Sequence, residues 1–124
     1  MPELGARASV QLTVTETDTA IALGSGDVPV LATPRVVALC EQASVAAIAN
    51  QLAPGETSVG MRVQLDHLQP NCVGSTVVAE ATLEKVEGRR MIFMVTVNDA
   101  RGLVAAGKVT RVIVEVERFL DKAQ

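Results

Sequence analysis

The sequence predicts an α+β fold in which one long helix is wrapped by a curved antiparallel sheet of about five strands. Residues 33–52 are apolar around nearly the whole circumference of a helix, which is typical of a helix buried in a core. Outside this segment and the loop before it, the chain reads as strands joined by short turns, and short turns connect antiparallel neighbours. A single buried helix therefore requires one sheet that curves around it.

Length and composition indicate a single domain over residues 1–124, with a hydrophobic content of 48% that is ample for a core. The formal net charge of −3 argues against nucleic acid as a partner. No apolar run reaches the roughly 18 residues that cross a bilayer, so we expect no membrane partner. The first residues, MPELGARASV, lack a secretory pattern, and Cys40 and Cys72 have no metal or disulfide spacing. We therefore expect two free thiols in the cytoplasm.

The first expected element is a strand over residues 8–15. Its apolar residues Val10, Leu12 and Val14 alternate and share one face, and β-branched side chains favour a strand. Residues 16–32 contain the run Gly-Ser-Gly-Asp and then a proline, which predicts a loop that carries at most a short turn.

The long helix has a clear start and a clear end. Thr33 is a good N-cap residue, and Pro34 suits the first helical position. The sequence Ala53-Pro54-Gly55 ends the helix, which we expect to extend to about Leu52.

Four strands are expected after the helix, separated by turns that contain proline or glycine. The first of them alternates, and the second also has a clear apolar face. The expected strands cover residues 57–68, 72–87, 90–98 and 103–117, followed by a short tail at 119–124. The apolar faces comprise Val59, Met61, Val63, Leu65 and His67 in the first strand, and Val73, Val77, Ala79, Ala81 and Leu83 in the second.

The order of strand, helix and four strands is that of the hot-dog arrangement, in which the sheet surrounds one helix. The edge strands of such a sheet and its outer face still need cover. We therefore expect a homodimer that forms edge to edge, or a higher homo-oligomer.

Three residues are candidates for a catalytic role: Thr33, Glu41 and His67. Glu41 is the only acidic residue within the helix, and burying a lone carboxylate is costly unless it has a partner or a function. His67 is the only histidine of the chain, and its ordinary pKa near 6.5 suits proton transfer. Glu41 lies about 12 Å along the helix axis from Thr33 and roughly 80° around it. The two side chains could flank a substrate at the helix N-terminus, where free N–H groups can stabilise an oxyanion.

Each of these residues also has a structural interpretation. Thr33 could serve only as a helix cap, and Glu41 could be solvated in a groove or paired with an arginine of a partner chain. His67 could be a satisfied core residue. Gly60 lies inside a strand pattern, where glycine indicates either a bulge or the close approach of a ligand such as an acyl group.

Three segments of the chain resemble a known family: VLATPRVVALCEQAS, GETSVGMRVQLDHLQPNCVGS and KVEGRRMIFMVTVND. They occur in the order and at the separations found in the hot-dog thioesterases related to fluoroacetyl-CoA thioesterase, and the resemblance extends over about residues 10–119. That family uses a threonine, a glutamate, a histidine and a glycine, which match Thr33, Glu41, His67 and Gly60. The resemblance implies an acyl-CoA thioesterase that hydrolyses its substrate to free acid and coenzyme A.

The segment before the threonine departs from the family pattern. In the fluoroacetyl-CoA enzymes it carries phenylalanines that form an apolar lid, whereas here it reads LGSGDVPVLAT and has no aromatic residue. We therefore expect a different small or medium acyl group. Attack on the thioester could come from Thr33, from Glu41 or from a water that they orient, with His67 carrying the proton.

Coenzyme A is expected only as part of the substrate, with no further cofactor and no metal, since one histidine and two unpaired cysteines make a poor ligand set. The phosphates of coenzyme A need basic partners. Arg90 and Arg111 are the proposed substrate-binding residues, and Arg35, Arg89 and Lys108 are further candidates. A charged turn such as the one that contains Arg90 is usually only a solvated turn.

Three rival functions remain open at this level. A hot-dog module could bind or sense acyl-CoA without hydrolysing it, although a sensor does not need the whole candidate set. An enoyl-CoA hydratase is disfavoured, because the adjacent Asp66 and His67 point to opposite faces of a strand. A purely structural protein is disfavoured by the carboxylate in an apolar helix.

Overall fold

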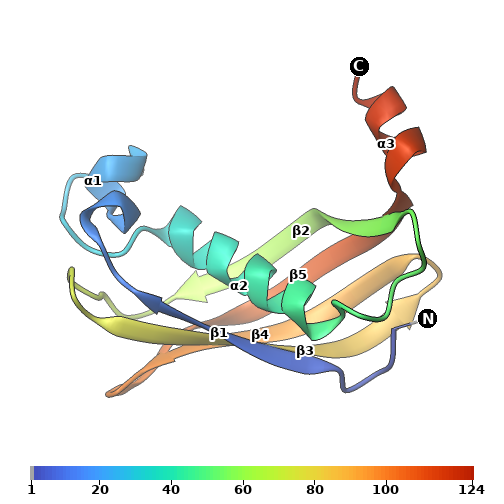
Figure 1. The fold of residues 1–124 in the computed structure, drawn as a ribbon. Coiled ribbons are helices and arrows are strands. Elements are labelled where there is room, and N and C mark those ends of the chain that lie inside the picture. The colour runs from blue at the N-terminus through green and yellow to red at the C-terminus, as the bar shows by residue number, and fades with distance from the viewer. Residues whose placement is uncertain (1) are drawn as a thin grey trace.

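The computed structural model describes residues 2–124 and confirms the predicted α+β architecture. One helix, α2, lies across a curved antiparallel sheet of five strands in the order β1-β3-β4-β5-β2 (Figure 1). The strands are β1 (Arg7–Thr13), β2 (Glu56–His67), β3 (Thr76–Glu87), β4 (Arg90–Asp99) and β5 (Gly102–Glu115). The helices are the 3-10 turn η1 (Glu16–Asp18), α1 (Ala20–Leu23), α2 (Thr33–Ala47) and α3 (Val116–Lys122).

The core lies between α2 and the sheet. Every second residue is buried from Val77 to Leu83 of β3 and from Met91 to Val97 of β4, as expected for strands with one face on a core. The buried strand residues are Val77, Ala79, Ala81 and Leu83 on β3 and Met91, Phe93, Val95 and Val97 on β4. They belong to one cluster with Val36, Leu39, Cys40 and Ala43 of α2. No helix within residues 2–124 is long and apolar enough to cross a membrane.

The start of α2 differs from the prediction by one residue. Ala32, in an extended conformation, is the N-cap, so Thr33 is the first helical residue and Pro34 the second. The N–H of Ala32 donates to the backbone oxygen of Asp18, and Arg35 forms an ion pair with the Asp18 carboxylate at 3.0 Å. Contacts with η1 therefore fix the start of the helix, and the hydroxyl of Thr33 is left free for another partner.

The end of α2 comes earlier than expected, at Ala47 rather than near Leu52. Ile48 leaves the helical conformation, and its N–H bonds back three residues to Val45. Further three-residue turns follow, and Ile48 itself is buried in the core. Apolar composition alone thus overestimated the length of the helix by one tight turn.

Within one chain α2 is buried on one face only, which corrects the expectation of a helix buried on nearly all sides. Val45 is 46% exposed, and Val37 and Ala38 are half-buried. The sheet-facing side carries Val36, Leu39 and their buried neighbours. An apolar strip of α2 therefore remains open beside the sheet.

The β2 strand contains a bulge that changes which side chains face the helix. Its register with β5 shifts between Gly60 and Arg62. A bulge inserts one extra residue, so the alternation of side chains between the two faces of the strand shifts by one residue at that point. Val59 accordingly does not share a face with Val63, contrary to the prediction, and Ser58 takes the inward position opposite the buried Ile113.

Several of the remaining boundaries also differ, and β1 ends at Thr13 rather than at residue 15. The segment 16–32 contains η1 and α1 rather than a simple loop. β3 begins at Thr76 instead of Cys72, because Gly74 adopts a positive φ that ends extended pairing, and Val73 is exposed. β5 ends at Glu115, whose side chain caps α3, so the tail is helical and stands beyond the end of β5 (Figure 1).

Candidate active site

Thr33 and His67 lie in direct contact. Thr33 stands in the first turn of α2, and His67 is the last residue of β2. The side chain of His67 faces inward because of strand alternation after the bulge, since Val63, Leu65 and His67 lie two residues apart. The Thr33 hydroxyl oxygen and His67 Nδ1 are 2.8 Å apart, which is hydrogen-bond distance. The sequence prediction that these two residues form part of one site is consistent with this geometry.

The surroundings of His67 favour a neutral imidazole. Burial lowers the pKa of His67 below its ordinary 6.5 and outweighs the opposite effect of the Gln69 backbone. Its Nε2 is buried and has no hydrogen-bond partner among residues 2–124. Nδ1 is the ring nitrogen in contact with Thr33, so it accepts a proton from Thr33 in the tautomer that carries the ring hydrogen on Nε2.

Glu41 belongs to a second cluster, on the middle of α2. Arg111 of β5 donates from Nη1 to Glu41 Oε2 at 2.8 Å. The same guanidinium donates from Nε to Ser58 Oγ and from Nη2 to the Ser58 backbone oxygen, both at 2.9 Å. Arg111 is only 7% exposed, so Glu41 has a buried counter-ion within its own chain.

Gly60 makes room for the Glu41 carboxylate. It lies opposite Arg111 in the β2–β5 register, at the bulge. A Cβ at this position would overlap Glu41 Oε2. Both interpretations of Gly60 therefore apply in part: there is a bulge, and the group that comes close is the carboxylate of Glu41.

The two clusters are separate within one chain. No hydrogen bond in the described part of the chain joins Glu41 to Thr33 or to His67. Along β2, the interval from Gly60 to His67 corresponds to roughly 20 Å, because the bulge leaves it opposite only the six-residue interval from Arg111 to Ala105 of β5. The structure thus brings together Thr33 with His67, and Glu41 with Gly60 and Arg111, as two halves.

A cavity of about 340 Å³ lies beside Thr33 and His67. The loop that contains Gly26, Asp27 and Val28 forms another part of its wall, and no aromatic side chain lines it. The segment before Thr33 therefore gives this cavity a partly polar wall without an aromatic side chain.

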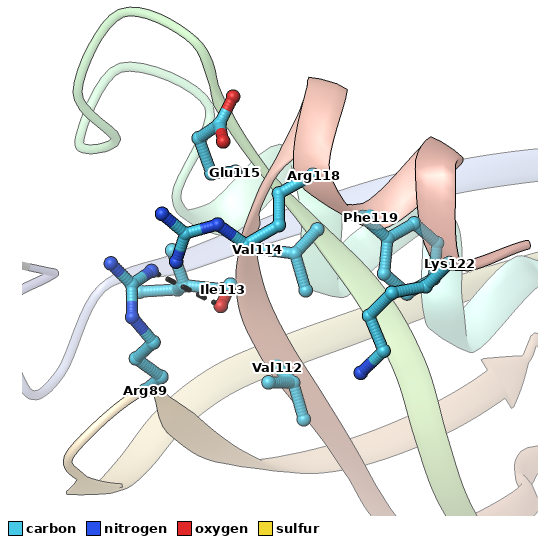
Figure 2. A pocket seen from close by; sticks show the side chains of 8 residues that line it. All are labelled: Arg89, Val112, Ile113, Val114, Glu115, Arg118, Phe119 and Lys122. Carbon is cyan, nitrogen blue, oxygen red and sulfur yellow. Dashed lines mark hydrogen bonds between the residues drawn. The ribbon is translucent and has the colours of Figure 1, made fainter.

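A second hollow, of about 250 Å³, lies between β5 and α3. Figure 2 shows its lining, in which Arg89, Arg118 and Lys122 surround an apolar floor. Arg89 donates to the Ile113 backbone oxygen at 3.3 Å, the dashed contact in the figure. None of the predicted catalytic residues lines this groove, which makes it a basic surface separate from both clusters.

The predicted phosphate-binding residues have different surroundings. Arg90 is exposed at the start of β4, opposite Val112 of the basic groove, and forms no ion pair among residues 2–124. Arg111 is buried and bonded to Glu41. Arg35 is held by Asp18, whereas Lys108 is exposed on β5.

Sequence reasoning missed Ser58 as a member of the Glu41 cluster. The signal was present but weak: Ser58 is a polar residue two positions before Gly60, on a strand whose inward residues are otherwise mainly apolar. Only the bulge and the pairing with β5 show that it faces Arg111.

The cysteines are free thiols, as expected. Cys40 is buried in α2, and burial, together with the charge of neighbouring Glu41, raises its pKa to about 11. A thiol with such a pKa is almost wholly protonated at neutral pH, so Cys40 is not a nucleophile.

A five-stranded sheet around one helix, with a threonine–histidine pair at the helix start and a held carboxylate at its middle, defines a hot-dog enzyme of the thioesterase type. The model of the family described as "Fluoroacetyl-CoA-specific thioesterase" (FlK) matches residues 14–117. The fluoroacetyl-CoA thioesterase of Streptantibioticus cattleyicolor is 36% identical over 95 residues, which cover 77% of this chain and 68% of that protein. The chain therefore belongs to the fluoroacetyl-CoA-specific thioesterase family, a family of thioester hydrolases.

Solved structures agree with this assignment and confirm the hot-dog fold. A structure of the fluoroacetyl-CoA thioesterase FlK superposes with a TM-score of 0.91 at 31% identity and covers 98% of this chain and 94% of that one. A thioesterase superfamily member from Thermus thermophilus gives a TM-score of 0.89 at 28% identity, with 99% and 93% coverage. The resemblance inferred from the three sequence segments is thereby confirmed.

Proposed function

We propose that this protein hydrolyses a small or medium acyl-CoA thioester to the free acid and coenzyme A. The observation that carries the proposal is the 2.8 Å contact between the Thr33 hydroxyl and Nδ1 of a neutral His67, at the start of the central helix. Membership of a thioesterase family supports the class of reaction.

In the proposed reaction His67 moves the proton. Neutral Nδ1 accepts a proton from the attacking hydroxyl, and the imidazolium then protonates the leaving thiolate of coenzyme A. The attacking oxygen belongs to Thr33, to Glu41 or to a water held between them, and the proton transfer to Nδ1 belongs to the Thr33 and water routes. Attack by either side chain leaves an acyl-enzyme that water then hydrolyses. Mass spectrometry of acid-quenched single turnovers distinguishes these routes by an acyl group on Thr33, on Glu41 or on neither.

The helix N-terminus offers one backbone donor for the developing oxyanion. Pro34 has no N–H, and the N–H of Arg35 donates to Ala32 within the first turn. The N–H of Thr33 is free of hydrogen bonds in the described part of the chain. We assign the oxyanion contact to Thr33, where the positive end of the helix dipole adds to it.

We further propose a homodimer in which the two halves of the site come from different subunits. β2 is an edge strand, and its neighbour α2 leaves an apolar strip open. Antiparallel pairing of two β2 strands about a point between Gly60 and His67 would set His67 of one subunit opposite Gly60 of the other. Glu41 would then lie close to the Thr33–His67 pair across the interface.

The acyl group and the phosphates are assigned by the surroundings of the cavities. Because no aromatic residue lines the cavity beside Thr33, we propose an acyl group other than fluoroacetyl. For the phosphates of coenzyme A we propose Arg90, which is exposed without an ion-pair partner in residues 2–124, next to the basic groove. Arg111 instead serves Glu41. Two free thiols support a cytoplasmic location.

The test is thiol release from a panel of acyl-CoA esters that differ in chain length, with wild type beside Glu41→Ala. We expect the wild type to release coenzyme A from at least one ester and the variant to lose two orders of magnitude or more in turnover. Acyl-CoA binding without release from any ester would instead identify a binding or sensing module.

A further inference from the structure

We infer that Ser58 is a positioning residue for Glu41, and that it acts through Arg111. The inference rests on the proposed thioesterase function, since it assigns a role within the same site. Ser58 lies on β2 immediately before the bulge, faces inward and is 9% exposed. It touches neither Thr33 nor His67, so any effect on the reaction must pass through the guanidinium.

The geometry of the guanidinium explains how Ser58 acts. Arginine presents its donors in a rigid plane, so two bonds to one edge fix both the position and the tilt of the group. Ser58 supplies both bonds on the Nε–Nη2 edge, one from its hydroxyl oxygen and one from its backbone oxygen. Nη1 is thereby directed at Glu41 Oε2.

The surroundings leave Arg111 little choice of partner. It is nearly fully buried, and a buried guanidinium with unpaired donors is costly. Its bonds in the described chain go only to Ser58 and Glu41. Gly60 closes the other side, because the Glu41 carboxylate fills the space of its absent Cβ. One carboxylate oxygen of Glu41 is thus held between Arg111 and Gly60, and the other is available to a water or a substrate.

Removal of the Ser58 hydroxyl should release this arrangement without touching the substrate. We expect Ser58→Ala to lower kcat roughly tenfold, the effect of one lost hydrogen bond to a charged group, while KM changes less than about twofold. Ser58→Thr keeps the hydroxyl and should recover most of kcat. Thr57→Ala, the exposed neighbour on the opposite face, is the matched control and should match wild type.

A double-mutant cycle separates positioning from a general effect on the fold. In a Glu41→Gln background, Ser58→Ala should lower kcat much less than it does in wild type, because the carboxylate that it positions is absent. An equal loss in both backgrounds, or wild-type kcat in Ser58→Ala, would overturn the inference. If Ser58→Ala does not fold, Ser58→Cys is the alternative, because cysteine has a similar volume and its sulfur is only a weak hydrogen-bond acceptor. The kcat of Ser58→Cys should then be below that of Ser58→Thr. Equal kcat values for the two variants would count against the positioning role.

Crystal structures of wild type and Ser58→Ala (or Ser58→Cys) test the inference independently of turnover. We expect the Arg111 guanidinium to rotate and Glu41 Oε2 to move away from Nη1 in the variant. An unchanged Arg111–Glu41 contact would overturn the positioning role even for an active enzyme. A wild type that releases no thiol from any ester would refute the proposed function, whereas the structural comparison would still decide the role of Ser58.

Discussion

His67 governs the pH dependence of the proposed reaction, because only the neutral imidazole can accept a proton from Thr33. Burial lowers the pKa of His67, so the neutral form persists below pH 6.5. We expect kcat/KM to be level near neutrality and to fall on the acid side with a midpoint below 6.5. A pH–rate profile measures this midpoint, and a midpoint above 6.5 would contradict the assignment. His67→Gln should be almost inactive at every pH.

Gly60 is required at its position by the carboxylate rather than by its own backbone angles. Gly60→Ala places a Cβ on Glu41 Oε2, so the carboxylate must move. We expect kcat to fall at least tenfold, while the midpoint of thermal unfolding changes by only a few degrees. Thiol release and calorimetry measure the two quantities. An alanine variant with wild-type kcat would show that Glu41 does not need its observed position.

At the residue scale, sequence reasoning found the reactive residue types but not all of their partners. Three features are unusual enough to be recognised from the sequence alone: a lone histidine, a carboxylate in an apolar helix and a glycine in a strand. The contacts of Arg111 depend on which residue of β2 faces β5 and the helix, and the bulge decides that. Ser58 and the role of Arg111 therefore could not be derived from spacing.

At the element scale, polarity patterns predicted the number and order of the strands well. They predicted less well which side chains of each strand face the core. Residues 57–68 alternate as a strand should, but one extra residue at the bulge reverses the faces before it. The same limit applied to α2, whose apolar sequence continues beyond Ala47 although tight turns replace the helix there. Patterns detect a preferred period, whereas ends and bulges are set by tertiary contacts.

The hydrogen bonds and the ion pair of Asp18, which connect η1 to α2, should contribute measurably to the free energy of unfolding. Asp18 is buried and accepts hydrogen bonds from the Thr15 N–H and hydroxyl and from Arg35. Burial raises the pKa of Asp18, but these bonds outweigh it and hold the pKa below 3.8. We expect Asp18→Asn to cost about 1–3 kcal/mol of unfolding free energy at pH 7, measured in urea.

The contribution of Asp18 to stability should decrease at low pH. Because the folded-state pKa of Asp18 is lowered, its contribution is complete above the unfolded value of 3.8 and is lost as the pH falls through the folded pKa. The difference between wild type and Asp18→Asn should therefore shrink at pH values below 3.8. Asp27→Asn, at an exposed loop position, is the control and should change stability by less than about 0.5 kcal/mol. A difference in unfolding free energy between wild type and Asp18→Asn that does not change with pH would argue against a stabilising role of the Asp18 charge.

At the scale of the whole molecule, the chain holds two half-sites and an open strand edge on the same side of α2. The sheet order leaves β2 at one edge, and each of the two elements exposes a large apolar side chain: Val45 of α2 is 46% exposed and Met61 of β2 is 50% exposed. Apolar surface beside an unpaired edge is costly in water. Pairing of two subunits along β2 would remove this cost and complete the catalytic set in one step.

Mixing two inactive variants tests this arrangement directly. Thr33→Ala retains the Glu41 half, and Glu41→Ala retains the Thr33–His67 half. If the site combines both subunits, a mixed dimer has one intact site and one doubly defective site. With random exchange, half of the dimers are mixed, so about one quarter of wild-type activity should return. Exchange through mild denaturation, followed by thiol release, measures the recovery, and light scattering establishes the dimer. No recovery from a chain that exchanges freely would mean that each site lies within a single subunit, and that Glu41 reaches Thr33 by a movement of its own chain.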